Sequence, residues 1–346
     1  MLHKVPLVAR MAADPFAGPL PPLVAPTSSL EHAVAHKSLG VGVASGGFLV
    51  FYYMGIFKVL QQLGLIREGE VRTAGVSIGS LAMGVAFPGM GSHDEFVQRG
   101  IVFAERCRSN RLCFGTLDKE YFAYMDDFLT PNVSEAITGR SCMVFSRGNT
   151  SHPVGEFVCD YEDREAVKQA MRVSSYVPGW SSPAPSIEYK GAPGFDGIFS
   201  QLMPCPEGVS HCLKMSALPP FDPRRALEGL LDPRELWATA KELVFAVRTF
   251  LGDNPRQALR EASEARTLAT LDVRAWGRVL ATNQAPLPDI YPGRYRRSGL
   301  SPTQWFMHML VPPSAEMVQT LYKEGQADGL AFAKAVGWEG AEALQL

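Results

Sequence analysis

The order of strand-like and helix-like segments predicts an α/β protein with a mainly parallel central sheet. Residues 39–44 are a short apolar run, which is typical of a buried strand, and residues 71–76 are a second strand-like stretch. The first run leads into a glycine turn and a segment with apolar residues at helical spacing, and the second leads into a helix of small residues, 78–86. A strand, a turn and a helix that occur twice in succession favour a parallel sheet covered by helices.

Further elements are expected to extend this sheet and then to cover it. The expected elements before residue 215 are strands at 141–146 and 154–159, a helix at 163–172, and a hairpin over 186–196 that turns at Gly191. Strand patterns fade after this point. Helical periodicity is found at 234–251, 255–280 and 314–336. Because no flexible linker separates these helices from the sheet region, we expect them to pack on the same domain.

The chain divides into three regions by composition. Residues 1–35 are rich in Pro and Ala and poor in acidic residues, so we expect disorder there, with a targeting segment as an alternative. Residues 36–215 carry the strand and turn patterns and are expected to form the catalytic domain. Residues 216–346 are expected to form a helical C-terminal extension that packs on that domain.

Charge and hydropathy exclude some classes of partner. The 346 residues carry a formal net charge of only -2, so no overall field favours nucleic acid, and any contact with a membrane is expected to be local. Because no run of eighteen apolar residues occurs, we expect no transmembrane segment. Nothing in the pattern indicates an obligate protein partner.

The cysteine pattern predicts an intracellular protein, cytoplasmic or plastid, that is soluble or peripheral to a membrane. The six cysteines contain no C-x-x-C pair, and a chain of this length does not need disulfides to form a core, so we expect mostly reduced thiols and no zinc site. The sequons at Asn132 and Asn149 are then expected to be unmodified, since we find no signal peptide.

A candidate nucleophile lies between the second strand and its helix. Gly75-Val76-Ser77-Ile78-Gly79 matches G-x-S-x-G. In that context the motif forms a strained turn that exposes the serine hydroxyl, and glycines are needed where strand and helix approach closely. The competing interpretation is a glycine-rich turn with an inert serine.

A second glycine turn precedes this motif by 31 residues. Ser45-Gly46-Gly47-Phe48 joins the first strand to its helix, where backbone N–H groups are unpaired and the helix dipole favours an anion. The turn therefore predicts an oxyanion hole for acyl transfer. Phosphate binding is the alternative, although neither G-x-G-x-x-G nor a P-loop lysine is present.

Two Asp-Gly pairs are candidates for a catalytic carboxylate. Asp196-Gly197 follows the predicted hairpin, at a strand end where glycine permits close backbone approach. Asp328-Gly329 lies within a helical pattern, and we expect it on the surface.

These motifs, in this order and spacing, resemble the patatin-like phospholipase family, including its lipid-droplet triacylglycerol lipase branch. The resemblance covers residues 39 to about 215, and Arg172-Val173-Ser174-Ser175-Tyr176-Val177-Pro178 resembles the family's stretch before its aspartate. It implies a three-layer α/β/α fold with a C-terminal helical layer. It also implies a Ser77–Asp196 dyad, an oxyanion hole at Gly46, Gly47 and Phe48, and no cofactor or metal.

The implied activity is that of a carboxylic ester hydrolase. Ser77 attacks a fatty-acyl ester of a phospholipid, galactolipid or acylglycerol, Asp196 takes the proton, and water hydrolyses the acyl-enzyme. The substrate is therefore a lipid, and the enzyme would work at a membrane or lipid-droplet surface.

Departures from the family pattern leave two alternatives open. Ser45 replaces a glycine, Leu49 and Val50 replace a basic or apolar residue and a glycine, and Ile198 replaces a small residue. A lipid-binding or storage protein with weakened catalysis is one alternative. The other is an α/β-hydrolase triad in which His211 or His308 joins Ser77 and Asp196.

Overall fold

The computed structural model describes residues 27–87, 92–149, 152–220, 233–251 and 287–346, together with 256 and 260. The strands are β1 (Leu39–Val43), β2 (Arg72–Val76), β3 (Ser141–Asn149), β4 (His152–Val158), β5 (Ile187–Tyr189), β6 (Ala192–Asp196) and β7 (His211–Met215). The longer helices are α1 (Thr27–Ala35), α2 (Val50–Gln62), α4 (His93–Ser109), α5 (Leu117–Phe128), α7 (Arg164–Ser174), α9 (Pro233–Leu251), α12 (Pro302–Leu310) and α13 (Ala315–Ala335). The short ones are η1 (Gly47–Leu49), α3 (Ile78–Ala82), η2 (Met83–Ala86), η3 (Arg111–Cys113), α6 (Val133–Ile137) and η4 (Gly197–Phe199).

The protein is a mixed α/β fold around one sheet, as predicted. The strand order is β5-β6-β3-β2-β1-β7, and β4 pairs with β3 off this path. The central pairs β7–β1, β1–β2 and β2–β3 are parallel. The pairs that involve β4, β5 and β6 are antiparallel, and the predicted hairpin over 186–196 lies at that edge as β5 and β6. The carboxyl ends of β1, β2 and β7 therefore meet at one edge of the sheet.

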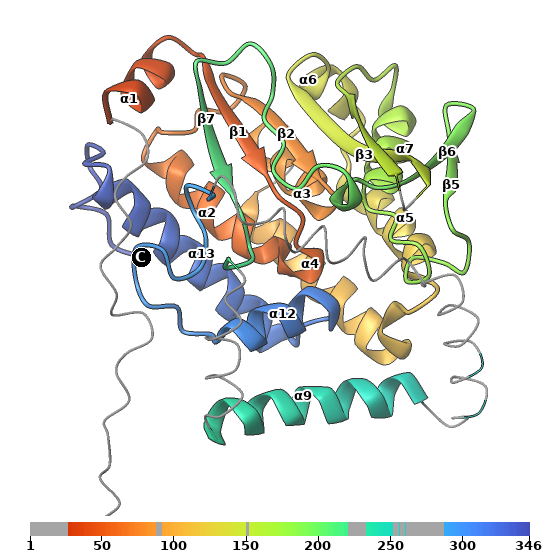
Figure 1. Ribbon diagram of the computed structural model, residues 1–346. Helices are drawn as coiled ribbons and strands as arrows, with labels where there is room; N and C mark the ends of the chain where they lie inside the picture. The colour runs from red at the N-terminus through yellow and green to blue at the C-terminus, as the bar shows by residue number, and fades with distance from the viewer. Residues whose placement is uncertain are drawn as a thin grey trace, which may run out of the picture.

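Helix α3 packs against α2, α7 and β2, helix α7 packs on β3 and β6, and α13 packs along α2 (Figure 1). The opposite face of β1 is covered differently. A Cβ on Gly42 would lie 2.1 Å from the carbonyl oxygen of Pro204, so the irregular segment 204–209 lies directly on the backbone of the strand. This approach explains the glycines in an otherwise apolar run.

The contact between α2 and α13 depends on glycine. A Cβ on Gly55 would lie 2.1 Å from the carbonyl oxygen of Tyr322, and a Cβ on Gly325 would lie 2.0 Å from that of Tyr52. The two helices therefore touch through their backbones. The predicted helices 234–251 and 314–336 are confirmed as α9 and α13, whereas 255–280 falls almost entirely outside the described residues.

The expected surface position of Asp328 is wrong. Asp328 is 1% exposed, accepts a hydrogen bond from the Tyr52 hydroxyl at 2.8 Å, and forms an ion pair with Arg296 at 2.7 Å. Burial raises the pKa of Asp328 to about 7, and the Arg296 charge lowers it. The helix carries this carboxylate on the same side as Gly325, so the close contact with α2 buries it.

The expected disorder of residues 1–35 is wrong for its last part. Residues 27–35 form α1, whose Leu30 and Ala33 belong to the hydrophobic core. The low acid content that predicted disorder does not prevent an apolar face from packing on the sheet. Residues 1–26 lie outside the described residues.

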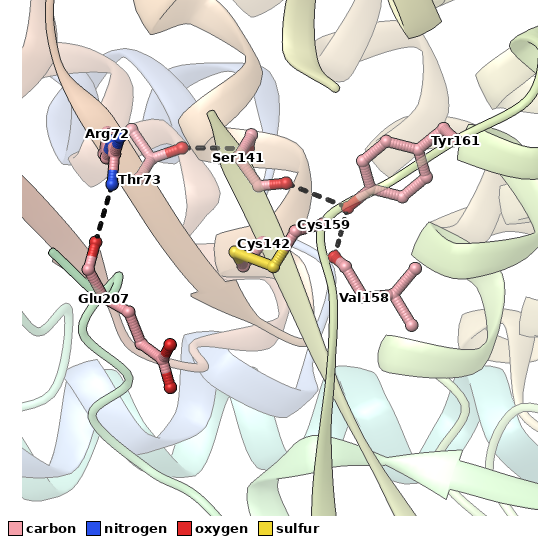
Figure 2. Close-up of a disulfide and its surroundings, with 8 residues drawn as sticks. All are labelled: Arg72, Thr73, Ser141, Cys142, Val158, Cys159, Tyr161 and Glu207. Atoms are coloured by element: carbon pink, nitrogen blue, oxygen red, sulfur yellow. Dashed lines mark hydrogen bonds between the residues drawn. A yellow bond between two sulfur atoms is a disulfide. The ribbon is translucent and has the colours of Figure 1, made fainter. Parts of the chain in front are cut away.

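The expectation of reduced cysteines is also wrong. The six cysteines form three disulfides, Cys107–Cys113, Cys142–Cys159 and Cys205–Cys212. The first closes the turn after α4, the second joins β3 to the residue that follows β4 (Figure 2), and the third joins segment 204–209 to β7. Spacing along the chain failed as a guide because the fold brings the cysteines of each pair together. Disulfides are typical of oxidising compartments, so cysteine usage no longer supports the predicted intracellular location.

The surroundings of the second disulfide are joined by hydrogen bonds (Figure 2). Thr73 on β2 donates to the Ser141 hydroxyl at 2.8 Å, and the Tyr161 hydroxyl donates to the backbone carbonyls of Ser141 and Val158. These contacts lie at the start of β2, at the opposite end of the strand from Ser77. Among the described helices, none is long and apolar enough to cross a bilayer.

Candidate active site

Ser77 lies at the carboxyl end of β2 in a strained conformation. Its φ of 56° and ψ of -131° are unusual for a residue with a side chain, and α3 begins at the next residue. A Cβ on Gly75 would lie 2.5 Å from the carbonyl oxygen of Gly79, and a Cβ on Gly79 would lie 2.6 Å from that of Ala44. Both motif glycines are therefore required by backbone contacts, and the turn has the geometry that the motif predicts.

Ser174 supports this turn from α7. Its hydroxyl accepts a hydrogen bond from the backbone N–H of Ser77 at 3.0 Å and lies 2.6 Å from the carbonyl oxygen of Val144 and 2.7 Å from the Ser80 hydroxyl. Our sequence analysis included Ser174 in the stretch that precedes Asp196 but assigned it no role. Its structural role is to hold the strained backbone of Ser77.

Asp196 lies against the Ser77 hydroxyl. The Ser77 Oγ donates to Asp196 Oδ2 at 2.6 Å, and the backbone N–H of Ile198 donates to Asp196 Oδ1 at 2.8 Å. The carboxylate lies at the end of β6, which pairs with β3. Gly197 follows it because a Cβ there would lie 2.4 Å from the carbonyl oxygen of Val144. Residues 119 positions apart in the sequence are thus in direct contact.

Burial makes Asp196 a stronger base than an exposed carboxylate. It is fully buried, and this burial raises its pKa from 3.8 to about 7, whereas the hydrogen bonds from Ser77 and Ile198 lower the pKa. A pKa close to the working pH is suited to general-base catalysis.

The glycine turn after β1 provides backbone donors beside this pair. Gly47 has a φ of +53°, and η1 begins there and continues directly into α2. The N–H groups of Gly47 and Phe48 belong to the first helical turn, which has no preceding helical carbonyls to accept their hydrogen bonds. Gly47 and Phe48 line the same cavity as Ser77, whereas Gly46, which we also predicted for the oxyanion hole, is not part of the lining. The arrangement suits a developing negative charge on a carbonyl oxygen.

Ser45, which departs from the expected glycine, does not disturb this turn. Its backbone carbonyl accepts a hydrogen bond from the Tyr53 hydroxyl at 3.1 Å, and that hydroxyl accepts one from the backbone N–H of Ala217 at 2.8 Å. Tyr53 therefore ties the turn after β1 to the chain that follows β7.

The other three departures lie in different surroundings. Leu49 is fully buried in the hydrophobic core. Val50 and Ile198 line the cavity. As the first residue of α2, Val50 lies on the side of the helix that faces the opening.

A cavity of about 100 Å³ surrounds the Ser77 and Asp196 side chains. One side of it is apolar, and we call these residues the apolar wall: Phe48, Phe51, Phe96, Phe103, Met309 and Leu310. Two of them come from α12 in the C-terminal region, which the sequence did not associate with the site. The apolar wall is suited to an acyl chain.

The cavity lining also includes residues with polar groups, and we call these residues the polar wall: Asp118, Tyr121, Tyr124, Arg172, Ser175 and Trp180. They lie on α5, α7 and the segment after α7. Sequence reasoning missed all but Arg172 and Ser175, because α5 carries no motif that marks it as part of a site.

The two histidines that the sequence offers for a triad lie outside the cavity lining. His211 is the first residue of β7, at the end of the sheet away from Ser77, and it hydrogen-bonds the Ser29 hydroxyl at 3.2 Å. His308 is buried on α12. Within the described part of the chain, no histidine lines the cavity.

Single replacement of histidine is therefore expected to leave ester hydrolysis within about tenfold of the parent, because a triad histidine would cost roughly 10⁴. The variants are His93→Gln, His152→Gln, His211→Gln and His308→Gln. The measurement is kcat/KM for a nitrophenyl ester, with circular dichroism as the folding control. A folded variant that loses all activity would favour the triad alternative.

Substitution of Gly47 is expected to lower both rate and stability. A Cβ on Gly47 would lie 2.1 Å from the carbonyl oxygen of Met309, so in Gly47→Ala either α12 or the turn has to move. The donors then tilt, and we expect the acylation rate of Gly47→Ala to fall by at least about 10².

Gly64→Ala is the matched control for this variant. Gly64 has a φ of +67° but nothing within 4 Å of its Cβ position, so it reproduces the backbone strain without the clash. We expect it to lose roughly 1–2 kcal/mol of stability and to keep the parent's acylation rate. Stopped-flow acylation and thermal unfolding test both variants, and normal acylation by Gly47→Ala would place the oxyanion hole elsewhere.

Comparison with known proteins adds no relative. No protein-family model matches the chain, and no curated protein matches it. Over the residues that the structure describes, no three His, Cys, Asp or Glu side chains are grouped as metal ligands.

Proposed function

We propose that this protein is a patatin-like serine acyl hydrolase that cleaves fatty-acyl esters of lipids with Ser77 and Asp196. The observation that carries the proposal is the buried 2.6 Å hydrogen bond between the two side chains, in a cavity with an apolar wall. The three-layer α/β/α assignment and the family membership belong to the same proposal. They are supported by the parallel central strands and the glycine contacts at both turns.

Acylation requires Ser77 to lose its proton as it attacks the ester carbonyl. Asp196 Oδ2 is in position to take that proton, and its raised pKa favours the transfer. The carbonyl oxygen becomes negatively charged and is stabilised by the N–H groups of Gly47 and Phe48. The tetrahedral intermediate then collapses, Asp196 returns the proton to the leaving alcohol, and an acyl-Ser77 ester remains.

Deacylation repeats the same steps with water. Asp196 removes a proton from water, the hydroxide attacks the acyl-Ser77 carbonyl, and Ser77 regains the proton when the fatty acid leaves. Cofactors have no part in this scheme.

The direct Ser77–Asp196 contact argues against the triad alternative. A histidine base would have to lie between the two side chains, and a separation of 2.6 Å leaves no room for an imidazole ring. The alternative of a lipid-binding protein without turnover is weakened by Ser45, whose side-chain change leaves the turn hydrogen-bonded.

Reaction with a fluorophosphonate probe tests the proposal. We expect rapid labelling of the wild-type protein and a single adduct that peptide mass spectrometry maps to Ser77, since an activated serine beside an oxyanion hole reacts quickly. The denatured protein is the control, and it should not be labelled. Labelling that is absent, or that falls on another serine, would reject the site.

We further propose that the enzyme works at a lipid surface and that α9 contacts it. Helix α9 packs against α12, which contributes Met309 and Leu310 to the cavity (Figure 1). Four large apolar side chains on α9 are exposed: Trp237, Leu243, Val244 and Val247. Lys241 and Arg248 on the same helix are exposed as well, which is suited to anionic head groups. An exposed apolar patch beside an apolar cavity is typical of interfacial binding.

Trp237→Ser is expected to weaken vesicle binding at least about fivefold, because it removes the most exposed large apolar side chain of α9. The measurement is co-sedimentation with vesicles of phosphatidylcholine and phosphatidylserine. Val154→Ser on β4 is the control, since Val154 is also well exposed but lies on another element. If both variants bound the vesicles equally well, the proposal that α9 contacts the lipid surface would be contradicted.

A further inference from the structure

The polar wall contains buried groups that the fold itself does not satisfy. Tyr121 Oη, Tyr124 Oη, Ser175 Oγ and Trp180 Nε1 are buried, and none has a hydrogen-bond partner of good geometry among the described residues. A buried polar atom left unpaired is costly, and native proteins contain few of them. The Tyr121 and Ser175 hydroxyls are close enough to interact with each other, whereas Tyr124 Oη and Trp180 Nε1 have no partner among the described residues. Such groups in the lining of one cavity indicate a bound group that supplies their hydrogen bonds.

These groups are close to the reacting atoms. The pKa of the Tyr121 hydroxyl is raised first by burial, lowered by the neighbouring Ser175 hydroxyl and raised by the charge of Asp196, so Tyr121 lies near both side chains. Tyr124 stands one helical turn further along α5, and its ring lies 4.9 Å from that of Phe103 on the apolar wall. A ligand that reaches Tyr124 therefore also lies beside the acyl site.

The polar wall carries no net charge. Arg172 and Asp118 form two parallel hydrogen bonds of 2.8 and 2.6 Å, so each charge is neutralised by the other. Asp196 is the only other charged residue in the described lining, and it is an acid. An anionic phosphate in this cavity would find no free cation and would face the negative charge of Asp196. The tyrosines and Trp180 offer neutral donors instead.

We propose that the polar wall binds the uncharged, hydroxyl-bearing alcohol part of the substrate ester, such as the glycerol of a monoacylglycerol or the sugar of a glycolipid. The inference rests on the proposed function. In this arrangement the acyl chain lies against the apolar wall, the hydroxyl groups of the alcohol lie against the polar wall, and the ester carbonyl lies at Ser77. Phospholipids are then poor substrates, because their phosphate replaces the group that the wall recognises.

Four esters with the same octanoyl chain test this assignment in the wild-type protein. They are mono-octanoylglycerol, an octanoyl monogalactosylglycerol, methyl octanoate and octanoyl lysophosphatidate. We expect kcat/KM for at least one of the first two to exceed that for each of the last two by at least about tenfold, because a site with buried unpaired groups rejects a ligand that lacks the matching hydroxyls. The ratio between the first two distinguishes glycerol from sugar. Nitrophenyl octanoate measures turnover without a hydroxylated alcohol.

Two variants remove single polar atoms of the wall while keeping an aromatic ring in place. In Tyr124→Phe and Trp180→Phe we expect the preference for the hydroxylated ester over methyl octanoate to fall about fivefold, as for the loss of one neutral hydrogen bond. Tyr295→Phe is the matched control, because its buried hydroxyl also has no well-formed hydrogen bond but lies outside the cavity lining. We expect the control to keep the full preference.

Thermal unfolding separates binding from folding. Removing an unsatisfied buried hydroxyl is expected to leave the Tm of Tyr124→Phe unchanged or higher, so a loss of preference without a loss of stability supports the proposal. Hydrolysis of nitrophenyl octanoate without preference among the four esters would overturn this inference and leave the acyl hydrolase intact. No hydrolysis of any ester would overturn both.

Discussion

Ser77→Ala is expected to lower kcat/KM for a nitrophenyl ester by at least about 10⁴, because the hydroxyl that forms the acyl-enzyme is gone. The fold should persist. The variant keeps the backbone N–H at position 77 that donates to the Ser174 hydroxyl, and the only side-chain hydrogen bond removed is the one to Asp196. The measurement is steady-state hydrolysis, together with thermal unfolding of the same preparation.

The control for this variant is Ser80→Ala on the next turn. Ser80 is also buried, and its hydroxyl hydrogen-bonds the Gly75 carbonyl and the Ser174 hydroxyl. It supports the turn without contacting Asp196, so a moderate loss of stability with most activity retained is expected. If Ser77→Ala kept most of its activity while folded, the nucleophile would have to be another residue.

Asp196→Asn is expected to abolish activity and, above neutral pH, to stabilise the protein. The amide cannot accept the Ser77 proton, and we expect a loss of about 10⁴ in kcat/KM. It can still accept a hydrogen bond from the backbone N–H of Ile198 and donate one to Ser77, so the geometry is preserved. Above neutral pH the Asp196 carboxylate is charged, buried and not paired with a cation, so its replacement by a neutral amide should raise the free energy of unfolding.

The pH dependence of this effect follows from the raised pKa of Asp196. The folded state holds its proton more tightly than the unfolded chain, so the stability that this proton contributes is present below pH about 4 and is lost as the pH rises through about 7. Asp196→Asn should therefore match the parent near pH 4 and exceed it at pH 8, by up to roughly 4 kcal/mol.

Activity of the parent should change in the opposite direction. The base is active only when ionised, so kcat/KM should rise with pH around a midpoint near 7. Denaturant unfolding at both pH values and a pH–rate profile measure the two effects. A variant that is less stable than the parent at pH 8 would contradict the burial argument.

Motifs in which the backbone geometry admits only glycine were predictable from the sequence. A Cβ on Gly75, Gly79 or Gly197 would lie 2.6 Å or less from a backbone carbonyl oxygen. Because only glycine fits at such positions, their spacing forms a recognisable sequence motif. The central strands were equally clear, because β1 is a continuous apolar run and β2 leads directly into the G-x-S-x-G motif.

Features that depend on distant residues could not be predicted in this way. The burial of Asp328 is set by which elements the fold brings together, and it leaves no local pattern. The disulfide partners are only 6, 17 and 7 residues apart, but without a C-x-x-C pair the sequence did not indicate which cysteines join. The tyrosines of α5 have a periodicity that fits an ordinary core helix. Only the arrangement around the cavity distinguishes them from packing residues.

The position of Met309 against Gly47 has a consequence for the order in which the site is made during protein synthesis. The glycine turn at Gly47 and Ser77 leave the ribosome long before α12, which follows more than two hundred residues later and supplies part of the apolar wall. Contacts between such distant segments form late in folding. The nascent chain can thus build its sheet and its strained serine turn first, but the cavity around Ser77 is not closed until the C-terminal helices have been translated and have docked.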